Sequence, residues 1–321
     1  MLIPLLALAW TAHADPWSEV AATAEMPVDE VRSLVEGAAT KQQSILDRMA
    51  TPWEARPWHE YHPIFLNEAR VEKGLAFWEA HAETLDRVHR ETGVPPEVVV
   101  AIIGVETRYG EVMGNDAVLD ALYTLGFHHE RRGAFFRREL GHFLRLAKDE
   151  GWTLDEPRGS YAGAMGIGQF IPSSYRAYAV DGDGDGRRDL FDNPTDGIAS
   201  VANYFVEHGW ERDQPVLLEA SVDGVDLDGL LDRGLSLTTT WGALEARGVE
   251  VSDPPEGDPR ARLYDFDLAD GAEVRVGLNN FYVITRYNHS KLYARVVHEL
   301  SQQLAAGRAD RLKSTAAGAE E

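Results

Sequence analysis

The sequence predicts a mainly α-helical protein of the α+β class, with one small β-containing part. Apolar residues recur at helical spacing over residues 29–85 and again over residues 95–208. After Pro215 the spacing changes to an alternation of apolar and polar residues, which is typical of half-buried strands. The chain has 321 residues, enough for one large domain or for two to three smaller ones packed together.

The first 14 residues predict a cleaved signal peptide. An apolar segment at residues 2–10 is followed by Ala12-His13-Ala14, a pattern that fits cleavage before Asp15. The segment is too short to span a bilayer as a mature helix. It lacks the basic residues expected at its start, so a mis-assigned start, an atypical signal and a frayed apolar terminus remain as alternatives.

Two helical regions follow, at residues 15–85 and 86–214. The first is interrupted by a Pro- and Trp-rich connector, TPWEARPWHEYHP. The second has glycine-rich interruptions at residues 151–168 and 182–186. We expect the second region to be the core of the protein.

Residues 215–288 predict a small β-containing subdomain. The segments YDFDL and EVRVGL alternate with period two, and Ala269-Asp270-Gly271 between them has the composition of a turn. A β-hairpin is therefore predicted here.

Helical spacing returns in SKLYARVVHELSQQL, which predicts a C-terminal helix over residues 289–306. We expect this helix to pack with the region at residues 15–85. The remaining residues, 307–321, are polar and small, and they predict a disordered tail.

Charge and cysteine content exclude several classes of protein. The chain carries 53 acidic and 31 basic residues, a net charge of -22, which repels nucleic acid and anionic lipid at long range. It contains no cysteine, which excludes disulfides, thiolate catalysis, cysteine-ligated zinc and a lipid-modified cysteine at the N-terminus.

The segment VVVAIIGVETRYG, at residues 98–110, ends an apolar run with a carboxylate, Glu106. Pro95-Pro96 predicts the start of a helix and Gly110 its end. On such a helix Ile102, Ile103 and Tyr109 would surround Glu106 with apolar and aromatic surface.

Two effects would then keep Glu106 protonated, since desolvation and the negative end of the helix both disfavour a carboxylate. A carboxyl group protonated near neutral pH can act as a general acid. Alternatively, Glu106 pairs with Arg108 or another arginine, or points to solvent. These residues alone leave the choice open.

The segment GSYAGAMGIGQFIPSSY, at residues 159–175, is rich in small residues and contains Ser160 and Gln169. Glycines let the backbone approach a ligand closely, and the amide of Gln169 can both donate to and accept from the acetamido group of a sugar. The segment could line a sugar cleft, or it could be a tight structural loop. It does not match a nucleotide-binding loop.

The segment DGDGDGRRDLFDNPTD, at residues 181–196, matches a calcium loop of alternating oxygen ligands. Positions one, three, five and nine of the loop are occupied by carboxylates: Asp181, Asp183, Asp185 and Asp189. Gly186 lies at the turn, and Arg187 lies at position seven, where the ligand is a backbone carbonyl. Position twelve is Asp192, which is shorter than the usual glutamate, and Asp196 is a rival closing ligand. We predict a structural Ca²⁺, with a solvated acidic turn as the alternative.

Five segments in this order resemble the lytic murein transglycosylases of the B type: IIGVETRYG, HERRGAFFRREL, SYAGAMGIGQFIPSSY, DGDGDG with SVANYFVEHGW, and NNFYVITRYNHS. The resemblance covers about residues 61–300. It implies that residues 86–214 form a lysozyme-like helical core with one catalytic glutamate, and Glu106 occupies that place.

The resemblance also implies a set of cleft residues. Ser160 and Gln169 match the family's residues near the glutamate and the bound N-acetyl sugars. Other matching residues line the cleft or close it from the far side: Tyr61, Arg131, Arg132, Tyr204, Asn280, Tyr282 and Tyr287. The family's EF-hand-like calcium site is closed by a ligand beyond position twelve, which favours Asp196 over Asp192.

The implied partner is the glycan strand of peptidoglycan, with cell-wall synthesis or remodelling proteins as further candidates. Neither nucleic acid nor an organic cofactor is expected, and the protein should be a monomer. Because the lipobox cysteine of the membrane-anchored members is missing, we expect a soluble periplasmic form.

The implied reaction uses Glu106 first as an acid and then as a base. It protonates the oxygen between N-acetylmuramic acid and N-acetylglucosamine, and then deprotonates the muramoyl 6-hydroxyl, giving a 1,6-anhydromuramoyl end. One carboxylate is enough because the 2-acetamido group of the substrate takes the place of a second. The alternatives are a hydrolytic muramidase and a calcium-stabilised protein that binds the wall without turnover.

Overall fold

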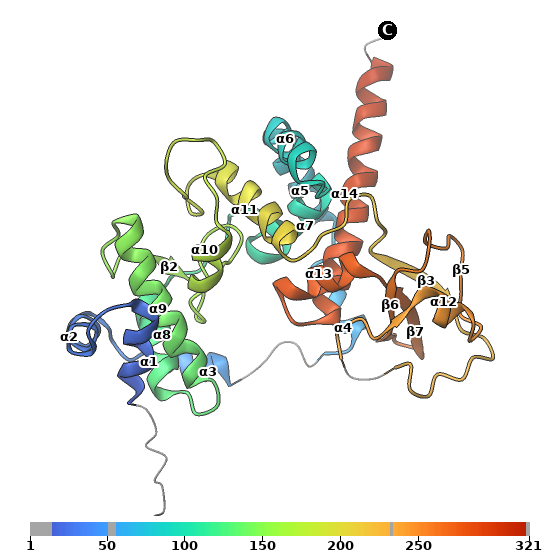
Figure 1. Ribbon diagram of the computed structural model, residues 1–321. Coiled ribbons are helices and arrows are strands. Elements are labelled where there is room, and N and C mark those ends of the chain that lie inside the picture. The colour runs from blue at the N-terminus through green and yellow to red at the C-terminus, as the bar shows by residue number, and fades with distance from the viewer. Residues whose placement is uncertain (1–14, 51–55, 232–233, 319–321) are drawn as a thin grey trace, which may run out of the picture. The chain divides into compact units, whose positions relative to one another are not determined.

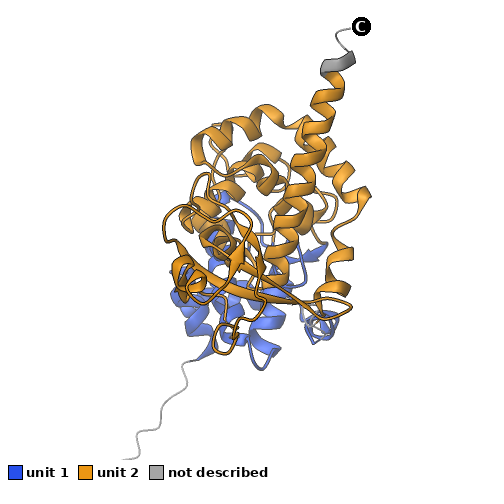
Figure 2. Cartoon of the chain, turned by 90° about the vertical axis from the view of Figure 1, so that its right-hand side faces the viewer, with its two compact units in different colours: residues 1–50, 115–164, 171–173 blue, residues 51–114, 165–170, 174–321 orange. Residues whose placement is uncertain are grey.

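The computed structural model describes residues 15–50, 56–231 and 234–318, so the predicted signal peptide at residues 1–14 lies outside the described residues. The chain divides into two compact units, which Figure 2 distinguishes by colour. The described part of unit 1 is residues 15–50, 115–164 and 171–173, and the other described residues form unit 2.

Unit 1 is a set of packed helices with one very short strand pair (Figure 1). Its elements are α1 (Pro16–Ala24), α2 (Val28–Ala38), α3 (Gln43–Met49), β1 (Asp116–Ala117), α8 (Val118–His128), α9 (Gly133–Glu150) and β2 (Arg158–Gly159). Helix α1 packs against α9, where a Cβ atom at Gly141 would lie only 2.7 Å from the carbonyl oxygen of Val20. Glycine therefore permits this close approach of the two helices.

The helices of unit 2 include one nearly apolar helix, α7. They are α4 (Trp58–Tyr61), the 3₁₀ helix η2 (His62–Ile64), α5 (Glu68–Ala80), α6 (Ala82–Thr92), α7 (Pro96–Thr107), most of α10 (Pro172–Tyr178), α11 (Pro194–Glu207), α12 (Trp241–Glu245), α13 (Asn279–Tyr287) and α14 (Lys291–Gly318). Helix α7 contacts α5, α6, α11 and α14. Its residues from Val98 to Gly104 are all buried, so α7 is apolar on every face, as a helix enclosed by others must be.

Unit 2 also contains a five-stranded antiparallel sheet with the strand order β4-β6-β7-β3-β5. The strands are β3 (Leu217–Ser221), β4 (Thr239–Thr240), β5 (Glu250–Val251), β6 (Arg260–Asp267) and β7 (Ala272–Gly277). The predicted hairpin is confirmed as β6 and β7, closed by a hydrogen bond from the Leu268 amide to the Gly271 carbonyl. Trp241, Leu263 and Val276 are core residues of this subdomain.

The expected grouping of residues 15–85 into one region is wrong. Helices α1 and α3 pack against α9 and α8 within unit 1, whereas α5 belongs to unit 2 and packs against α14. In the sequence, the Pro- and Trp-rich segment at residues 51–63 interrupts the helical pattern between these helices.

The predicted disordered tail at residues 307–321 is also wrong in its described part, because α14 continues to Gly318. Eight of the tail's fifteen residues are alanine, arginine, leucine or lysine, which are strong helix formers. Arg311 also pairs with Glu72 and Glu79 of α5, at 2.5 and 3.7 Å. Neither α14 nor any other helix in the described ranges is long and apolar enough to cross a membrane.

Candidate active site

Glu106 lies in the last turn of α7. The helix has a proline at its first position, as predicted, and it ends at Thr107 because Arg108 and Tyr109 adopt left-handed conformations with φ of 53° and 66°. Ile102 and Ile103 are fully buried, while Glu106 stays partly exposed. The carboxyl group is thus placed where a buried helix meets solvent.

The direct partner of Glu106 is Tyr293 of α14, whose hydroxyl donates a hydrogen bond of 2.6 Å to Oε1 of the carboxyl group. Burial raises the pKa of Glu106 from 4.5 to about 7, and the hydrogen bond from Tyr293 opposes this rise. Within the described residues Glu106 forms no ion pair, which argues against the alternative of a pair with Arg108. A carboxyl group with this pKa can donate a proton near neutral pH.

Tyr109 does not surround Glu106 as predicted, because the helix ends before it. Its ring is wedged between α5 and α7, and its hydroxyl donates to the carbonyl of Arg70 at 2.9 Å. Cβ atoms at Gly74 and Gly104 would lie 2.4 and 2.6 Å from this hydroxyl. The two glycines therefore provide the space that the ring occupies.

Of the predicted tyrosines, Tyr287 lies with Tyr293 near Glu106, and Tyr61 lies near Tyr293. The rings of Tyr287 and Tyr293 are nearly parallel, with centroids 6.5 Å apart. The pKa of Tyr293 is raised well above its usual value, first by burial and then by Glu106, Tyr287 and Tyr61. Burial and the charge of Glu106 also raise the pKa of Tyr287, so Tyr287 and Tyr293 stay protonated and act as hydrogen-bond donors rather than bases.

Thr107 anchors the glycine-rich segment beside the end of α7. Its hydroxyl donates to the Ile167 carbonyl at 2.9 Å and accepts from the Gly110 amide at 3.0 Å. Gln169 in this segment donates from Nε2 to the carbonyls of Met113 and Gly166, both at 3.0 Å. These bonds use both donors of the amide and leave Oε1 to accept from a ligand N–H.

The structure does not support the predicted position of Asn280 in the cleft. Its side chain is completely buried and bonds to the backbone of Glu211 through both amide atoms, each at 2.8 Å, and to Gln214 at 3.0 Å. With its hydrogen-bonding groups used in this way, Asn280 holds the loop after α11 and does not face a substrate.

The contacts of Tyr204 and Tyr282 are with residues other than Glu106. Tyr204 is 7% exposed, and its hydroxyl donates to the Arg286 carbonyl at 2.5 Å. Its ring centroid lies 4.7 Å from that of Tyr287, so Tyr204 supports Tyr287. Tyr282 is partly exposed, and its phenol acts on the pKa of Tyr264 in the sheet.

The remaining predicted cleft residues, Ser160, Arg131 and Arg132, belong to unit 1. Ser160 follows β2, and its hydroxyl accepts from the amides of Ala162 and Ala164 at 3.3 and 3.1 Å. Arg131 and Arg132 are exposed in the turn before α9. Within unit 1, they are accessible cations.

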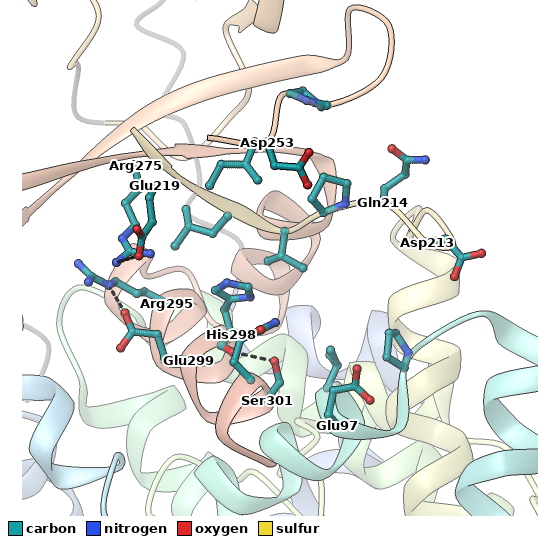
Figure 3. A pocket seen from close by; sticks show the side chains of 18 of the residues that line it. Glu97, Asp213, Gln214, Glu219, Asp253, Arg275, Arg295, His298, Glu299 and Ser301 are labelled. Carbon is teal, nitrogen blue, oxygen red and sulfur yellow. Dashed lines mark hydrogen bonds and ion pairs between the residues drawn. The ribbon is translucent and has the colours of Figure 1, made fainter. Parts of the chain in front are cut away.

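A separate hollow of about 1260 Å³ in unit 2 does not include Glu106 (Figure 3). It lies against α14, the start of α7 and the segment before β3. Both of its arginines are already ion-paired, Arg275 with Glu219 and Glu273, and Arg295 with Glu273 and Glu299. We therefore do not assign this hollow to the chemistry of Glu106.

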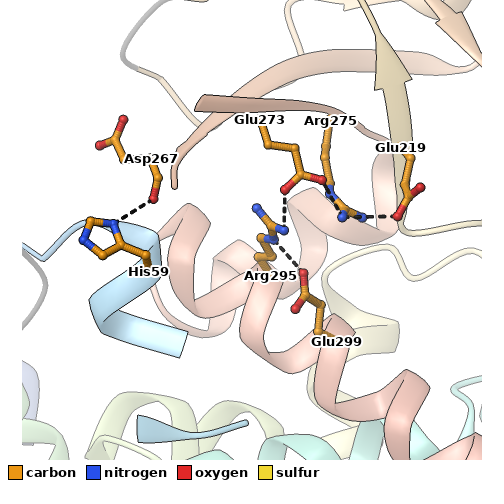
Figure 4. Close-up of polar contacts among 7 residues, drawn as sticks. All are labelled: His59, Glu219, Asp267, Glu273, Arg275, Arg295 and Glu299. Atoms are coloured by element: carbon orange, nitrogen blue, oxygen red, sulfur yellow. Dashed lines mark hydrogen bonds and ion pairs between the residues drawn. The ribbon is translucent and has the colours of Figure 1, made fainter. Parts of the chain in front are cut away.

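The buried Arg295 fixes α14, and hence Tyr293, to the sheet. Figure 4 shows its guanidinium between Glu273 and Glu299, with hydrogen bonds of 2.6 and 2.7 Å. The same group lies 4.1 Å from the ring centre of Trp58 and 4.4 Å from that of Phe266. A buried cation held by two carboxylates and two rings restricts where α14 can lie.

Three carboxylates converge in the predicted calcium loop. The side-chain oxygens of Asp181, Asp183 and Asp196 lie within 4.8 Å of one another. Asp196 is completely buried, and burial together with the charges of Asp183 and Asp181 raises its pKa. Converging carboxylates repel one another unless a cation neutralises them, so the residues fit a hard divalent ion.

Only some of the candidate calcium ligands belong to this group of converging carboxylates. Asp196 joins the converging group as its third member, whereas Asp192 is exposed and outside it. Asp185 accepts a hydrogen bond from the Arg187 amide and is also outside the group. The loop turns at Gly186 with φ of 90°, as a calcium loop requires at this position.

The sequence reasoning missed Tyr293 and Thr107. Tyr293 lies 187 positions after Glu106, within an ordinary apolar helical run, and nothing in the spacing connects the two. Thr107 was adjacent to the predicted glutamate, and a threonine at a helix end could have suggested a side-chain to backbone bond.

Comparison with known proteins agrees with this geometry. A family model described as Transglycosylase SLT domain matches residues 9–302. The chain is 42% identical to the membrane-bound lytic murein transglycosylase B of Escherichia coli over 274 residues, 82% of this chain and 74% of the relative.

Two solved structures are similar over most of their length. The soluble lytic transglycosylase SltB1 of Pseudomonas aeruginosa is 43% identical with a TM-score of 0.83, covering 92% of this chain and 98% of that one. The Escherichia coli lytic transglycosylase Slt35 in complex with calcium is 39% identical with a TM-score of 0.80, covering 92% of each chain. The chain therefore belongs to the transglycosylase SLT domain family.

Proposed function

We propose that the chain is a lytic transglycosylase that cleaves the β-1,4 bond between N-acetylmuramic acid and N-acetylglucosamine in peptidoglycan. The observation that carries this proposal is the carboxyl group of Glu106, with a pKa of about 7 and a hydrogen bond from Tyr293. Glu106 donates its proton to the glycosidic oxygen and, as the carboxylate, then removes a proton from the muramoyl 6-hydroxyl. The product is a 1,6-anhydromuramoyl end.

The surroundings of Glu106 favour a mechanism with one carboxylate. Among the described residues, no other acidic side chain affects the pKa of Glu106. A paired nucleophile or base would lie close enough to do so. The acetamido group of the substrate therefore stabilises the developing oxocarbenium ion, and Oε1 of Gln169 is available to orient its N–H.

The mass of the products tests this proposal against hydrolysis. Mass spectrometry of the fragments released from purified sacculi should show anhydromuramoyl ends. A hydrolytic muramidase would give ends heavier by one water. If only hydrolysed ends appear, the 6-hydroxyl is not the attacking group and the proposed reaction is wrong.

Changing Tyr293 to phenylalanine should shift the pH dependence of the reaction. Because Glu106 must be protonated to act as an acid, we expect the rate to fall as pH rises through about 7. The hydroxyl of Tyr293 stabilises the carboxylate, so its loss raises the pKa of Glu106 and moves this decrease in rate to higher pH. The pH profile of kcat/KM checks the shift, and Tyr282→Phe should leave the profile unchanged. An unchanged profile in Tyr293→Phe would show that the hydrogen bond does not set the pKa of Glu106.

We also propose a structural Ca²⁺ held by Asp181, Asp183 and Asp196, with the Arg187 carbonyl as a further ligand. The converging carboxylates and the calcium complex of Slt35 support it. The ion would link the loop to the start of α11, which carries Asp196. A periplasmic location and a monomeric state are proposed with it, on the basis of the predicted leader and a cell-wall substrate.

A further inference from the structure

A small pocket beside the C-terminal end of α7 is lined by cations, although the protein carries a net charge of -22. Its volume is about 210 Å³, and it lies between the start of α5 and the end of α7. Arg70, Lys73 and Arg108 line it, and its described lining contains no acidic side chain. In a protein so rich in carboxylates, such a pocket is unexpected from composition alone.

Arg70 is a buried cation without a carboxylate partner in the described part of the chain. Its side chain is 8% exposed, one N–H donates to the Gly104 carbonyl, and the guanidinium lies 5.5 Å from the ring centre of Phe65. Burial lowers its pKa, and the positive charge of Arg108 lowers it further. A buried charge is costly unless an opposite charge compensates it.

Arg108 adds a second uncompensated charge. It is exposed, it directly follows the end of α7, and it forms no ion pair with a described residue. Lys73 differs, because its ammonium group contacts both carboxylate oxygens of Glu111 at 2.6 Å. Two of the three cations are therefore left without a counter-ion.

The larger hollow of unit 2 shows the opposite arrangement (Figure 3). There the arginines are neutralised within the protein, and the lining contains several acidic side chains: Glu97, Asp213, Glu219, Asp253, Glu256 and Glu299. Uncompensated arginines thus distinguish the small pocket from this larger hollow.

We propose that the pocket between α5 and α7 binds a small oxyanion, a carboxylate or a phosphate group, between Arg70 and Arg108. The planar guanidinium of arginine matches the two oxygens of either group. The pocket has room for a group of this size but not for a sugar chain. The site goes beyond the proposed glycan cleavage and does not depend on it.

Thermal unfolding of the full chain in increasing inorganic phosphate, or in increasing acetate, tests the site. Sodium chloride keeps the ionic strength constant. We expect a saturable rise in melting temperature for at least one of the two anions, because a ligand that binds only the folded state stabilises it. The anion that raises the melting temperature at the lower concentration identifies the group that the pocket prefers.

Variants of Arg108 connect this response to the pocket. Arg108→Asn keeps a residue that tolerates the left-handed backbone, and it should weaken anion binding by about tenfold or more. Arg108→Lys retains the positive charge but lacks the planar guanidinium, so this variant should bind the anion with intermediate affinity. Arg90→Gln removes an exposed cation from α6 and should respond as the wild type does.

Two results would overturn the proposal. One is the absence of any saturable response in the wild type. The other is an equal response in the wild type and in Arg108→Asn. In the second case the arginines would only complement the negative end of α7, and Arg108→Asn would melt lower by the same amount with and without the anion.

Discussion

Glu106→Gln is expected to abolish the release of anhydromuropeptides from purified sacculi. Glutamine keeps the shape of the side chain and can still accept from Tyr293, but its amide has no acidic proton to transfer to the glycosidic oxygen. Loss of general acid catalysis alone costs about 100-fold to 10,000-fold in rate. Chromatography and mass spectrometry of the soluble fragments measure this loss.

The matched control is Glu97→Gln on the same helix. Burial raises the pKa of Glu97 as well, but this residue lies at the opposite end of α7 from Glu106. Its substitution should leave release intact. Activity in Glu106→Gln close to that of the wild type would remove Glu106 from the mechanism.

The Glu106→Gln variant should be more stable than the wild type at alkaline pH. Because the pKa of Glu106 is raised in the folded state, the folded protein binds a proton that the unfolded chain loses above pH 4.5. Wild-type stability therefore falls as pH rises from 4.5 to about 7, and the glutamine variant escapes this loss. We expect a gain of about 1–3 kcal/mol at pH 8, measured by chemical denaturation. An equal loss of stability at all pH values would instead indicate damaged packing.

Removal of calcium is expected to lower the melting temperature by several degrees. A ligand present at 100 times its dissociation constant stabilises the folded state by about 2.7 kcal/mol, and a chelator removes this contribution. The buried Asp196 would then face Asp181 and Asp183 without a cation between them. Calorimetry with calcium and with a chelator measures the difference.

Two aspartate variants identify the closing ligand. Asp196→Asn should lose the response to the chelator, because Asp196 is the third member of the converging group. Asp192→Asn should keep it, since Asp192 is exposed and outside that group. The reverse pattern would restore Asp192 as the closing ligand, and identical melting curves of the wild type with and without chelator would argue against a structural ion.

Features that depend on neighbouring residues could be predicted from the sequence. The helix carrying Glu106, the β6–β7 hairpin and the acidic loop proposed to bind calcium all follow from local rules of spacing and turn composition. The ordered segments also predicted the family. Even here the end of a helix was uncertain, because the left-handed Arg108 and Tyr109 turned the Tyr109 ring toward α5.

The fold class, the family and the position of the glutamate could thus be read from the order of residues alone. The surroundings of that glutamate could not, because α14 brings Tyr293 to it from 187 positions away. The same holds for Asn280, which resembled a cleft residue but is buried against the loop after α11. The pKa of a carboxyl group depends on its burial and its contacts, and these are set by packing between segments that no local pattern connects.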